Sequence, residues 1–358
     1  MTIEWKRYID ASDLSETSKR LYASQLNCFM KDLDKPIEWI ISHPKECIAF
    51  LEEQGLSDAS RRNRVASVCS LLKHWSEASK EFETERDIWS NEQTVLNQRC
   101  IERTLTGQPT EREVVNWVPW KKVLEKEAVL RQTECGSWHH LLLSMYTHIE
   151  PMRGDFGNVR LFVDTPPVDM SEADNYIYLA SEPNKSTISL GEYKTSRKYG
   201  VFTRFLPDSL VYVIRRSLVD APRDWLFINM KGEPYAIKNS FVKFANRLLF
   251  EMFQKHFTIS LLRHSFISAI DFNKTNAGDL RDVSRNMHHS MEMQQYYRRD
   301  VPEQTVSLVG GDGEDEAARL RRKEEKRRLK KEKKKKKKKK KTNKMMEEAP
   351  LEPRIITL

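Results

Sequence analysis

The first 80 residues carry hydrophobic side chains at helical spacing. One stripe recurs in steps of four, three and four residues: Tyr22, Leu26, Phe29 and Leu33. Ser15 precedes this stripe, where its hydroxyl can cap the first turn of a helix. A second helix is predicted to begin near Pro44, because proline is favoured in the first turn, and to stop at Gly55.

A third helix is predicted after the capping residue Ser57, and its two faces differ. One face is apolar: Val65, Val68, Leu72 and Trp75. The other face is basic: Arg61, Arg62, Arg64 and Lys73. A basic helical face can bind phosphates or can be ordinary solvated charge, and the sequence leaves both interpretations open. We predict that these four residues contact DNA.

The pattern changes twice between residues 81 and 207. A polar stretch with one further helix leads to a linker, "TGQPTERE", and two apolar helical segments follow, at 114–130 and 137–149. The next segments alternate and are rich in β-formers, with Pro, Gly and Asn between them: "NVRLFVD", "NYIYLAS", "STISLGEYKT" and "VFTRFLP". They predict a small antiparallel sheet. Helical patterns then return at 209–219, 239–256, 260–272 and 277–289.

Composition excludes several classes of protein. Hydrophobic residues make up 39% of the 358 residues, and no run of about 18 apolar residues exists, so no membrane span is expected. The first residues lack the pattern of a signal peptide. Five scattered cysteines without a CxxC pair predict a reducing, intracellular environment, with neither a disulfide framework nor a zinc site.

Charge is concentrated at the C-terminus. The net charge is +9, but residues 317–344 alone carry +16 and residues 345–358 carry −2, which leaves −5 for residues 1–316. The basic character therefore belongs to the tail, and it gives no evidence that the folded body binds nucleic acid. We predict that this tail, with nine consecutive lysines, is disordered, and that it serves as a nuclear address if the host is eukaryotic.

Four short segments carry groups suited to phosphate chemistry. They are "EPMRGDF" with Arg153, "EYKTSRKYG" with Lys194, "SLLRHSF" with Arg263, and "MHHSMEMQQYYRR" with His289 and Tyr297. Two guanidinium groups can hold the oxygens of a phosphodiester in its transition state. A lysine can protonate a leaving oxygen, and cations can make a phenol a usable nucleophile. Neither a metal ion nor a nucleotide cofactor is needed, and no Walker or GxGxxG motif occurs.

The order Arg, hairpin Lys, "LRHS" helix, "HS" pair and Tyr resembles the tyrosine recombinase (phage integrase) family, whose catalytic fold type IB topoisomerases share. The resemblance covers residues from about 115 to 302. It looks closest to recombinases of eukaryotic mobile elements and large DNA viruses. It implies an α+β fold, mainly α with a small antiparallel sheet, in a two-domain C-shaped DNA clamp. The expected boundaries are 1–110 for a helical core-binding domain, 111–309 for the catalytic domain and 310–358 for the tail.

The resemblance also implies roles for single residues. Arg153 and Arg263 match the family's two catalytic arginines, and Asp155 matches a nearby acidic buttress. Lys194 matches the hairpin lysine, with Lys198 as the alternative. These residues are expected to serve strand cleavage more than folding.

The second box departs from the family pattern. It usually reads His-x-x-Arg, but Ser260 stands three residues before Arg263. A serine can donate a hydrogen bond but cannot exchange a proton near neutral pH. This leaves a slower enzyme, help from His264 or His288, or a protein that binds DNA without cutting it. His264 is expected to be structural.

Two tyrosines compete for the role of nucleophile. In the family the nucleophile usually lies nine residues after the histidine. Tyr297 lies eight residues after His289 and nine after His288, whereas Tyr296 lies one residue closer to each. We therefore predict Tyr297 as the nucleophile and His289 as the family's histidine, and we expect Tyr296 to be a core aromatic.

The resemblance predicts a site-specific recombinase or integrase that binds double-stranded DNA as a homotetramer. It would cut and rejoin strands through a 3′-phosphotyrosyl intermediate, without a cofactor. Two alternatives stay open: a type IB topoisomerase-like enzyme, and a catalytically silent DNA-binding relative.

Overall fold

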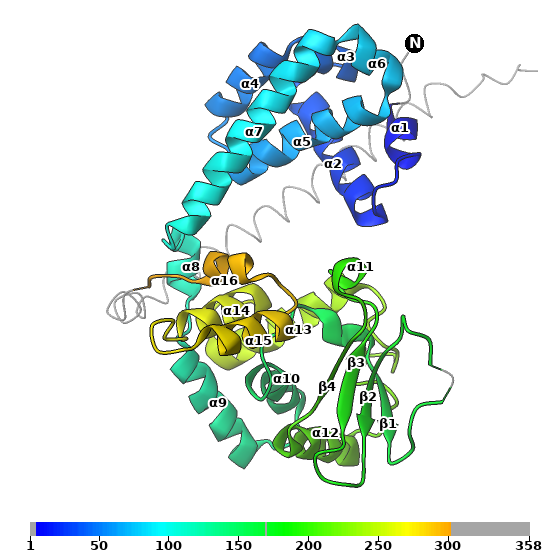
Figure 1. Cartoon of the computed structure of the whole chain (residues 1–358), viewed down its shortest axis with the longest axis vertical. Helices are drawn as coiled ribbons and strands as arrows, with labels where there is room; N and C mark the ends of the chain where they lie inside the picture. The colour runs from blue at the N-terminus through cyan, green and yellow to red at the C-terminus, as the bar shows by residue number, and fades with distance from the viewer. Residues whose placement is uncertain (1–4, 169, 302–358) are drawn as a thin grey trace, which may run out of the picture. The chain divides into compact units, whose positions relative to one another are not determined.

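The computed structural model describes residues 5–168 and 170–301. The chain is mainly helical, with one four-stranded sheet, and is therefore an α+β fold (Figure 1). No helix within the described residues is long and apolar enough to cross a membrane. The predicted tail, 310–358, lies outside the described residues.

The N-terminal helices share one hydrophobic core. They are α1 (Lys6–Asp10), α2 (Glu16–Leu33), α3 (Ile37–Ser42), α4 (Pro44–Glu53), α5 (Asp58–His74), α6 (Ser76–Glu81) and α7 (Glu83–Leu105). The predicted caps are confirmed, since Ser15 and Ser57 accept hydrogen bonds from backbone N–H groups three residues on. Trp89 of α7 is fully buried in the core, where its indole N–H donates to the carbonyl of Ile41 at 3.2 Å.

The next helices lead into the sheet. They are α8 (Glu111–Asn116), α9 (Trp120–Thr133), α10 (Trp138–Thr147) and the 3₁₀ helix η1 (Asp155–Asn158). The apolar segment at 114–130 is divided between α8 and α9 by Pro119, which cannot continue a helix from the preceding turn. The described residues up to Val301 belong to one compact unit. The boundary at residue 110 therefore stays a prediction.

The sheet is mixed, and the prediction of an antiparallel sheet was wrong for its first pair. Its strands are β1 (Arg160–Val163), β2 (Asn175–Leu179), β3 (Thr187–Leu190) and β4 (Phe202–Phe205), in that spatial order. β1 pairs with β2 in parallel, and the other two pairs are antiparallel. A parallel pair requires a connection long enough to carry the chain back. The segment between β1 and β2 does this, whereas the sequence pattern of single strands contains no such information.

The remaining helices follow β3 in the chain, and α13 to α16 lie together beside the sheet (Figure 1). They are α11 (Ser196–Tyr199), which lies in the connection between β3 and β4, and α12 (Asp208–Asp220), α13 (Lys238–Phe253), α14 (Ile259–Ser268), α15 (Ala277–Asn286) and α16 (Met291–Tyr297). Each of the four helical segments predicted after the sheet is confirmed. The last prediction extended too far, because α15 ends at Asn286 and His288 then adopts a left-handed conformation.

Candidate active site

Arg263 lies at the centre of the candidate site. Its helix α14 begins after Thr258, whose hydroxyl caps the first turn, and this places the side chain inside the protein with only 1% of its surface exposed. Its Nη1 donates to the carbonyl of Pro151 at 2.9 Å, and its Nη2 donates to the carbonyl of Met287 at 3.3 Å. One guanidinium thus joins the segment before Arg153 to the segment before His289.

Arg153 reaches the same place from the turn between α10 and η1. Its side chain is half-buried, and its Nη1 donates to the carbonyl of His288 at 3.0 Å. Its own carbonyl accepts a hydrogen bond from the hydroxyl of Tyr146 at 3.1 Å. Asp155, the predicted buttress, is buried two residues further on, at the first position of η1. Backbone carbonyls therefore orient both arginines, and this fixes the direction of each planar guanidinium.

Tyr297, the last residue of α16, meets both arginines. The centre of its ring lies 4.7 Å from the guanidinium carbon of Arg263. Burial alone would raise the pKa of this phenol. The charges of Arg263 and Arg153, together with hydrogen bonding to them, outweigh burial and lower the pKa below its ordinary value. A phenol that is more easily ionised is a better nucleophile at neutral pH.

Tyr296 has different surroundings. It is half-buried, so it is not the fully buried core aromatic that we expected from the sequence. Its carbonyl accepts a hydrogen bond from Arg299, and no arginine lies over its ring among the described residues. Of the adjacent pair, the structure therefore brings Tyr297, and not Tyr296, to Arg263.

His289 lies beside the Tyr297 ring, with the ring centres 5.2 Å apart. It is buried, and its Nδ1 lies 3.0 Å from the carbonyl of Ser290, so Nδ1 carries the hydrogen. Burial lowers its pKa to about 4, so the ring is neutral and Nε2 keeps its lone pair. Nε2 has no hydrogen-bond partner among the described residues. This lone pair is therefore unpaired, and the nitrogen becomes a stronger base only when a nearby negative charge raises its pKa.

His264 supports Tyr297 from the other side. Its Nδ1 donates to the carbonyl of Tyr297 at 2.7 Å, and the two rings are 5.0 Å apart. Burial, with the charge of Arg299 added, lowers the pKa of His264 to about 4. A neutral ring that donates to the backbone at the end of α16 can hold that segment in place.

Ser260 does not join this cluster. It is exposed on the first turn of α14, and its hydroxyl has no hydrogen-bond partner in the described part of the chain. The family's histidine at this position therefore has no direct replacement here. Nε2 of His289, beside the Tyr297 ring, is an unpaired ring nitrogen of the described site.

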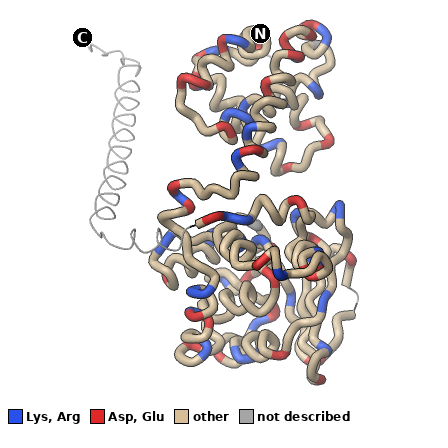
Figure 2. Tube along the Cα trace, turned by 60° about the vertical axis from the view of Figure 1, so that its left-hand side comes forward, with Lys and Arg blue, Asp and Glu red and all other residues tan. Residues whose placement is uncertain are grey.

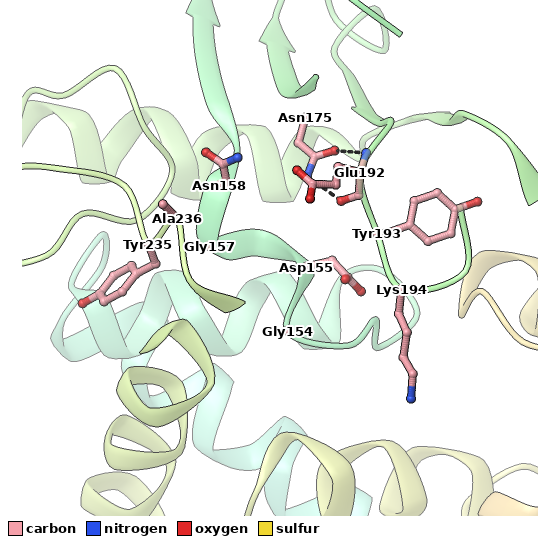
Figure 3. Close-up of a pocket in the computed structure, with 10 residues that line it drawn as sticks. All are labelled: Gly154, Asp155, Gly157, Asn158, Asn175, Glu192, Tyr193, Lys194, Tyr235 and Ala236. Carbon is pink, nitrogen blue, oxygen red and sulfur yellow. Dashed lines mark hydrogen bonds between the residues drawn. The ribbon is translucent and has the colours of Figure 1, made fainter. Parts of the chain in front are cut away.

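Lys194 lies in the connection between β3 and β4, as predicted, and is exposed. It lines the rim of a cavity of about 200 Å³, which it shares with Asp155, Asn175 and Glu192. Figure 3 shows its side chain pointing away from the Asp155 carboxylate. Its ammonium group has no hydrogen-bond or ion-pair partner among the described residues. Lys198, the alternative, is also exposed, with its Nζ 5.4 Å from the ring centre of Tyr199.

The predicted DNA contacts on α5 divide into two kinds. Arg61 is buried, and its guanidinium pairs with Glu52 at 2.7 Å and more distantly with Glu92 and Asp58. Arg64 pairs with Asp32 at 2.6 Å. These two arginines are held by carboxylates, so their prediction as free phosphate contacts is corrected.

Arg62 and Lys73 differ from them. Lys73 is exposed and Arg62 is half-exposed, and neither has an ion-pair partner among the described residues. They are eleven positions apart, which is close to three full turns, so they share one face of α5. They remain the candidates for contact with DNA.

Sequence reasoning missed three contact groups near the predicted residues: the backbone carbonyl of His288, the hydroxyl of Thr195 and the carboxylate of Glu150. The carbonyl of His288 receives Arg153, and Thr195, beside Lys194, donates its hydroxyl to the same oxygen at 3.3 Å. Glu150 binds Arg204 of β4 and Asn286 of α15, and this fixes the sheet against the end of that helix. Adjacency to a predicted residue was the only available signal, because a backbone carbonyl has no side-chain signature.

Solved structures similar to this chain include a recombinase. No family model matches the sequence, and no curated protein matches it either. A solved crystal structure of XerA recombinase is similar over 86% of this chain and 97% of its own, with 14% identity and a TM-score of 0.37. A likeness of this size carries no argument about activity. The side chains around Tyr297 are therefore the basis for assigning a function.

Proposed function

We propose that the protein is a DNA strand transferase of the tyrosine recombinase type. One observation carries the proposal: Arg153 and Arg263, 110 residues apart in the chain, both act on the phenol of Tyr297 and lower its pKa. Arginines held by carbonyls around a tyrosine suit phosphate chemistry better than structural ion pairing. The similarity of residue order to the recombinase family points to the same reaction.

In the proposed reaction the Tyr297 oxygen attacks a phosphorus atom of duplex DNA. The phenol proton passes to the unpaired Nε2 of His289, whose pKa is raised by the negative charge of the bound phosphate. Arg153 and Arg263 stabilise the charge on the two non-bridging oxygens. The bond from phosphorus to the 5′ oxygen breaks, Lys194 protonates that oxygen, and a 3′-phosphotyrosyl bond remains. A 5′ hydroxyl then gives its proton to Lys194 and attacks the same phosphorus. The bond from phosphorus to the Tyr297 oxygen breaks, the phenol recovers its proton from His289, and the strand is restored, so no external energy source is required.

The phosphate has to displace part of the cover over Arg263. The Tyr297 ring lies over the guanidinium, which is otherwise enclosed. A phosphate bound between the arginines would take the position beside Arg263 that the phenol holds here. We therefore propose that DNA binding shifts α16 by enough to admit the phosphate and keep the tyrosine within reach.

The decisive experiment uses nicked suicide duplexes, in which the freed 5′ end diffuses away and the covalent adduct accumulates. Wild-type protein should give an adduct that survives denaturing electrophoresis. Tyr297→Phe keeps the ring and removes only the attacking oxygen, so it should give no adduct and bind DNA normally. Tyr296→Phe is the matched control and should still form the adduct. Adduct formation by both single variants would place the nucleophile elsewhere.

Ser260 favours one second candidate, a DNA-binding relative without strand cleavage. Its exposed hydroxyl supplies no proton-transfer group in place of the family's histidine. Binding without adduct by the wild-type protein, on several suicide duplexes, would support this candidate. If an adduct does form, a recombinase exchanges strands between two duplexes, as a tetramer, whereas a topoisomerase IB-like enzyme relaxes one supercoiled molecule.

The Lys-rich tail leads us to propose the nucleus as the location in a eukaryotic host.

A further inference from the structure

His288 has a backbone conformation that is unusual for its residue type. Its φ of 56° lies in the left-handed region, which is sterically unfavourable for a residue with a Cβ. Strain of this kind persists only where neighbouring contacts hold the residue in place. The residue stands between the end of α15 and His289, so its conformation sets how the chain enters the candidate site.

The carbonyl of His288 is a shared acceptor. It receives Nη1 of Arg153 at 3.0 Å and the hydroxyl of Thr195 at 3.3 Å. Arg153 belongs to the arginine pair, and Thr195 directly follows Lys194. A single oxygen atom therefore links Thr195, the neighbour of Lys194, to Arg153 of the candidate site.

The ring of His288 makes a second link to the same connection. It packs between Tyr193, which precedes Lys194, and Phe202, which begins β4, with both ring-centre distances at 4.3 Å. The side chain is buried, and neither ring nitrogen has a hydrogen-bond partner among the described residues. The imidazole is thus used here as a flat body that fills space between two aromatic rings.

We infer that His288 is a positioning residue, which anchors the connection between β3 and β4 so that Lys194 stands at a fixed distance from Arg153 and Tyr297. The role of Lys194 as the proton donor rests on the proposed function, whereas the anchoring does not. Three contacts, at Tyr193, Thr195 and Phe202, hold an otherwise exposed connection. Misplacing a reacting group by about 1 Å can lower a rate roughly 100-fold, so such anchoring has a large effect.

Two substitutions separate the ring from the backbone. His288→Gly adopts the left-handed conformation without strain and keeps the carbonyl, but it leaves a gap between the aromatic rings. His288→Phe keeps a flat ring and removes the two unpaired nitrogens. If the ring acts by filling space, the Phe variant should restore the function that the Gly variant loses.

The first test compares two suicide duplexes. One is ordinary, and in the other a sulfur atom replaces the bridging 5′ oxygen, so that the leaving group departs as a thiolate and needs no proton. His288→Gly should cleave the ordinary duplex roughly 10–100-fold more slowly than wild type. It should cleave the thio-duplex at nearly the wild-type rate, as Lys194→Ala should, and His288→Phe should restore cleavage of the ordinary duplex. Equal slowing on both duplexes, or no rescue by Phe, would overturn the inference.

The second test needs no DNA cleavage. Trypsin cuts after Lys194, Arg197 and Lys198, and the fragments that result are identified by mass. The rate of cutting within this connection should rise severalfold in His288→Gly and remain at the wild-type value in His288→Phe. If His288→Gly is cut faster while the wild-type protein forms no adduct, the result supports the anchoring role of His288 and contradicts the proposed function. Unchanged cutting in His288→Gly would remove the anchoring, whatever the protein does to DNA.

Discussion

Arg153 and Arg263 have the same proposed role in the candidate site, but their surroundings differ. Arg153 is half-buried, whereas Arg263 is enclosed and donates to two carbonyls from separate segments of the chain. Sequence reasoning identified both arginines from their neighbours in the chain. It did not distinguish them, because burial depends on the groups that pack over a residue from elsewhere, and here that group is Tyr297.

This difference leads to separate expectations for the two arginines. Each alanine variant should slow cleavage about 10²–10³-fold, since each removes one preorganised donor. Arg263→Ala should also lose stability, at about 1–3 kcal/mol for each buried carbonyl left unpaired. Arg153→Ala should lose much less. Urea midpoints and single-turnover cleavage on saturating DNA measure the two effects, and Arg263→Lys serves as a control that keeps the charge without the planar fork. Equal midpoints for both alanine variants would contradict the structure.

Three histidines near Tyr297 should make stability depend on pH. His264, His288 and His289 have pKa values of about 4 in the folded protein, and burial is the main cause. An unfolded histidine has a pKa of about 6.5, so between pH 6.5 and 4 the unfolded state binds more protons. Their full contribution is present above pH 6.5 and is lost as the pH falls toward 4. The slope is about 1.4 kcal/mol per pH unit for each histidine.

This effect falls in the range from about pH 7 to about pH 5.5, where His140, whose pKa is also lowered by burial, adds to the slope. The carboxyl groups of Glu127 and Glu150 have lowered pKa values and stay ionised throughout it. Urea unfolding at several pH values should show the slope of the unfolding free energy against pH. The variant His288→Phe has one titrating group fewer, so it should lose about one third of the slope that His264, His288 and His289 contribute. A flat profile over this range would mean that the histidines are not buried in the neutral form.

At the scale of elements, the pattern of hydrophobic positions predicted most helices and all four strands. It predicted them because each element buries one face, so that hydrophobic residues recur along the sequence at the period of that element. Short helices such as α3 and α6 were missed, since two turns are too few to show a period. The parallel pairing of β1 with β2 was missed because pairing depends on the path of a connection, not on the strand.

The basic face of α5 shows how an element can mislead. All four cations lie on one helix, yet Arg61 and Arg64 turn to carboxylates from α2, α4 and α7. The double variant Arg62→Ala with Lys73→Ala should reduce the slope of DNA affinity against salt by about 0.9 for each phosphate that is no longer bound. Arg61→Ala is the matched control: it should lower stability and leave the slope unchanged. If the double variant keeps the wild-type slope, this face is solvated and contacts no DNA.

At the scale of the whole molecule, the strong positive charge and the residues of the candidate site lie in different parts of the sequence. Lys, Arg, Asp and Glu are interspersed along the described chain (Figure 2), in keeping with the small negative charge of residues 1–316. The arginines of the candidate site come from this weakly charged part. The lysine run adds a strong positive charge beyond it. Under the proposed function, the groups that would bind one phosphate and the groups that would attract DNA in general therefore belong to different parts of the sequence.

Truncation after Gly311 tests this separation. It removes the run of lysines and leaves a chain whose net charge is close to zero. The truncated protein should bind DNA more weakly at physiological salt, with a shallower salt dependence, because fewer counterions are released on binding. On saturating suicide duplex at low salt, its cleavage rate should equal that of the full chain, since Arg153, Arg263 and Tyr297 are all retained. A paired measurement at low and physiological salt separates the two effects. Loss of cleavage on saturating DNA would show that the tail takes part in the reaction itself.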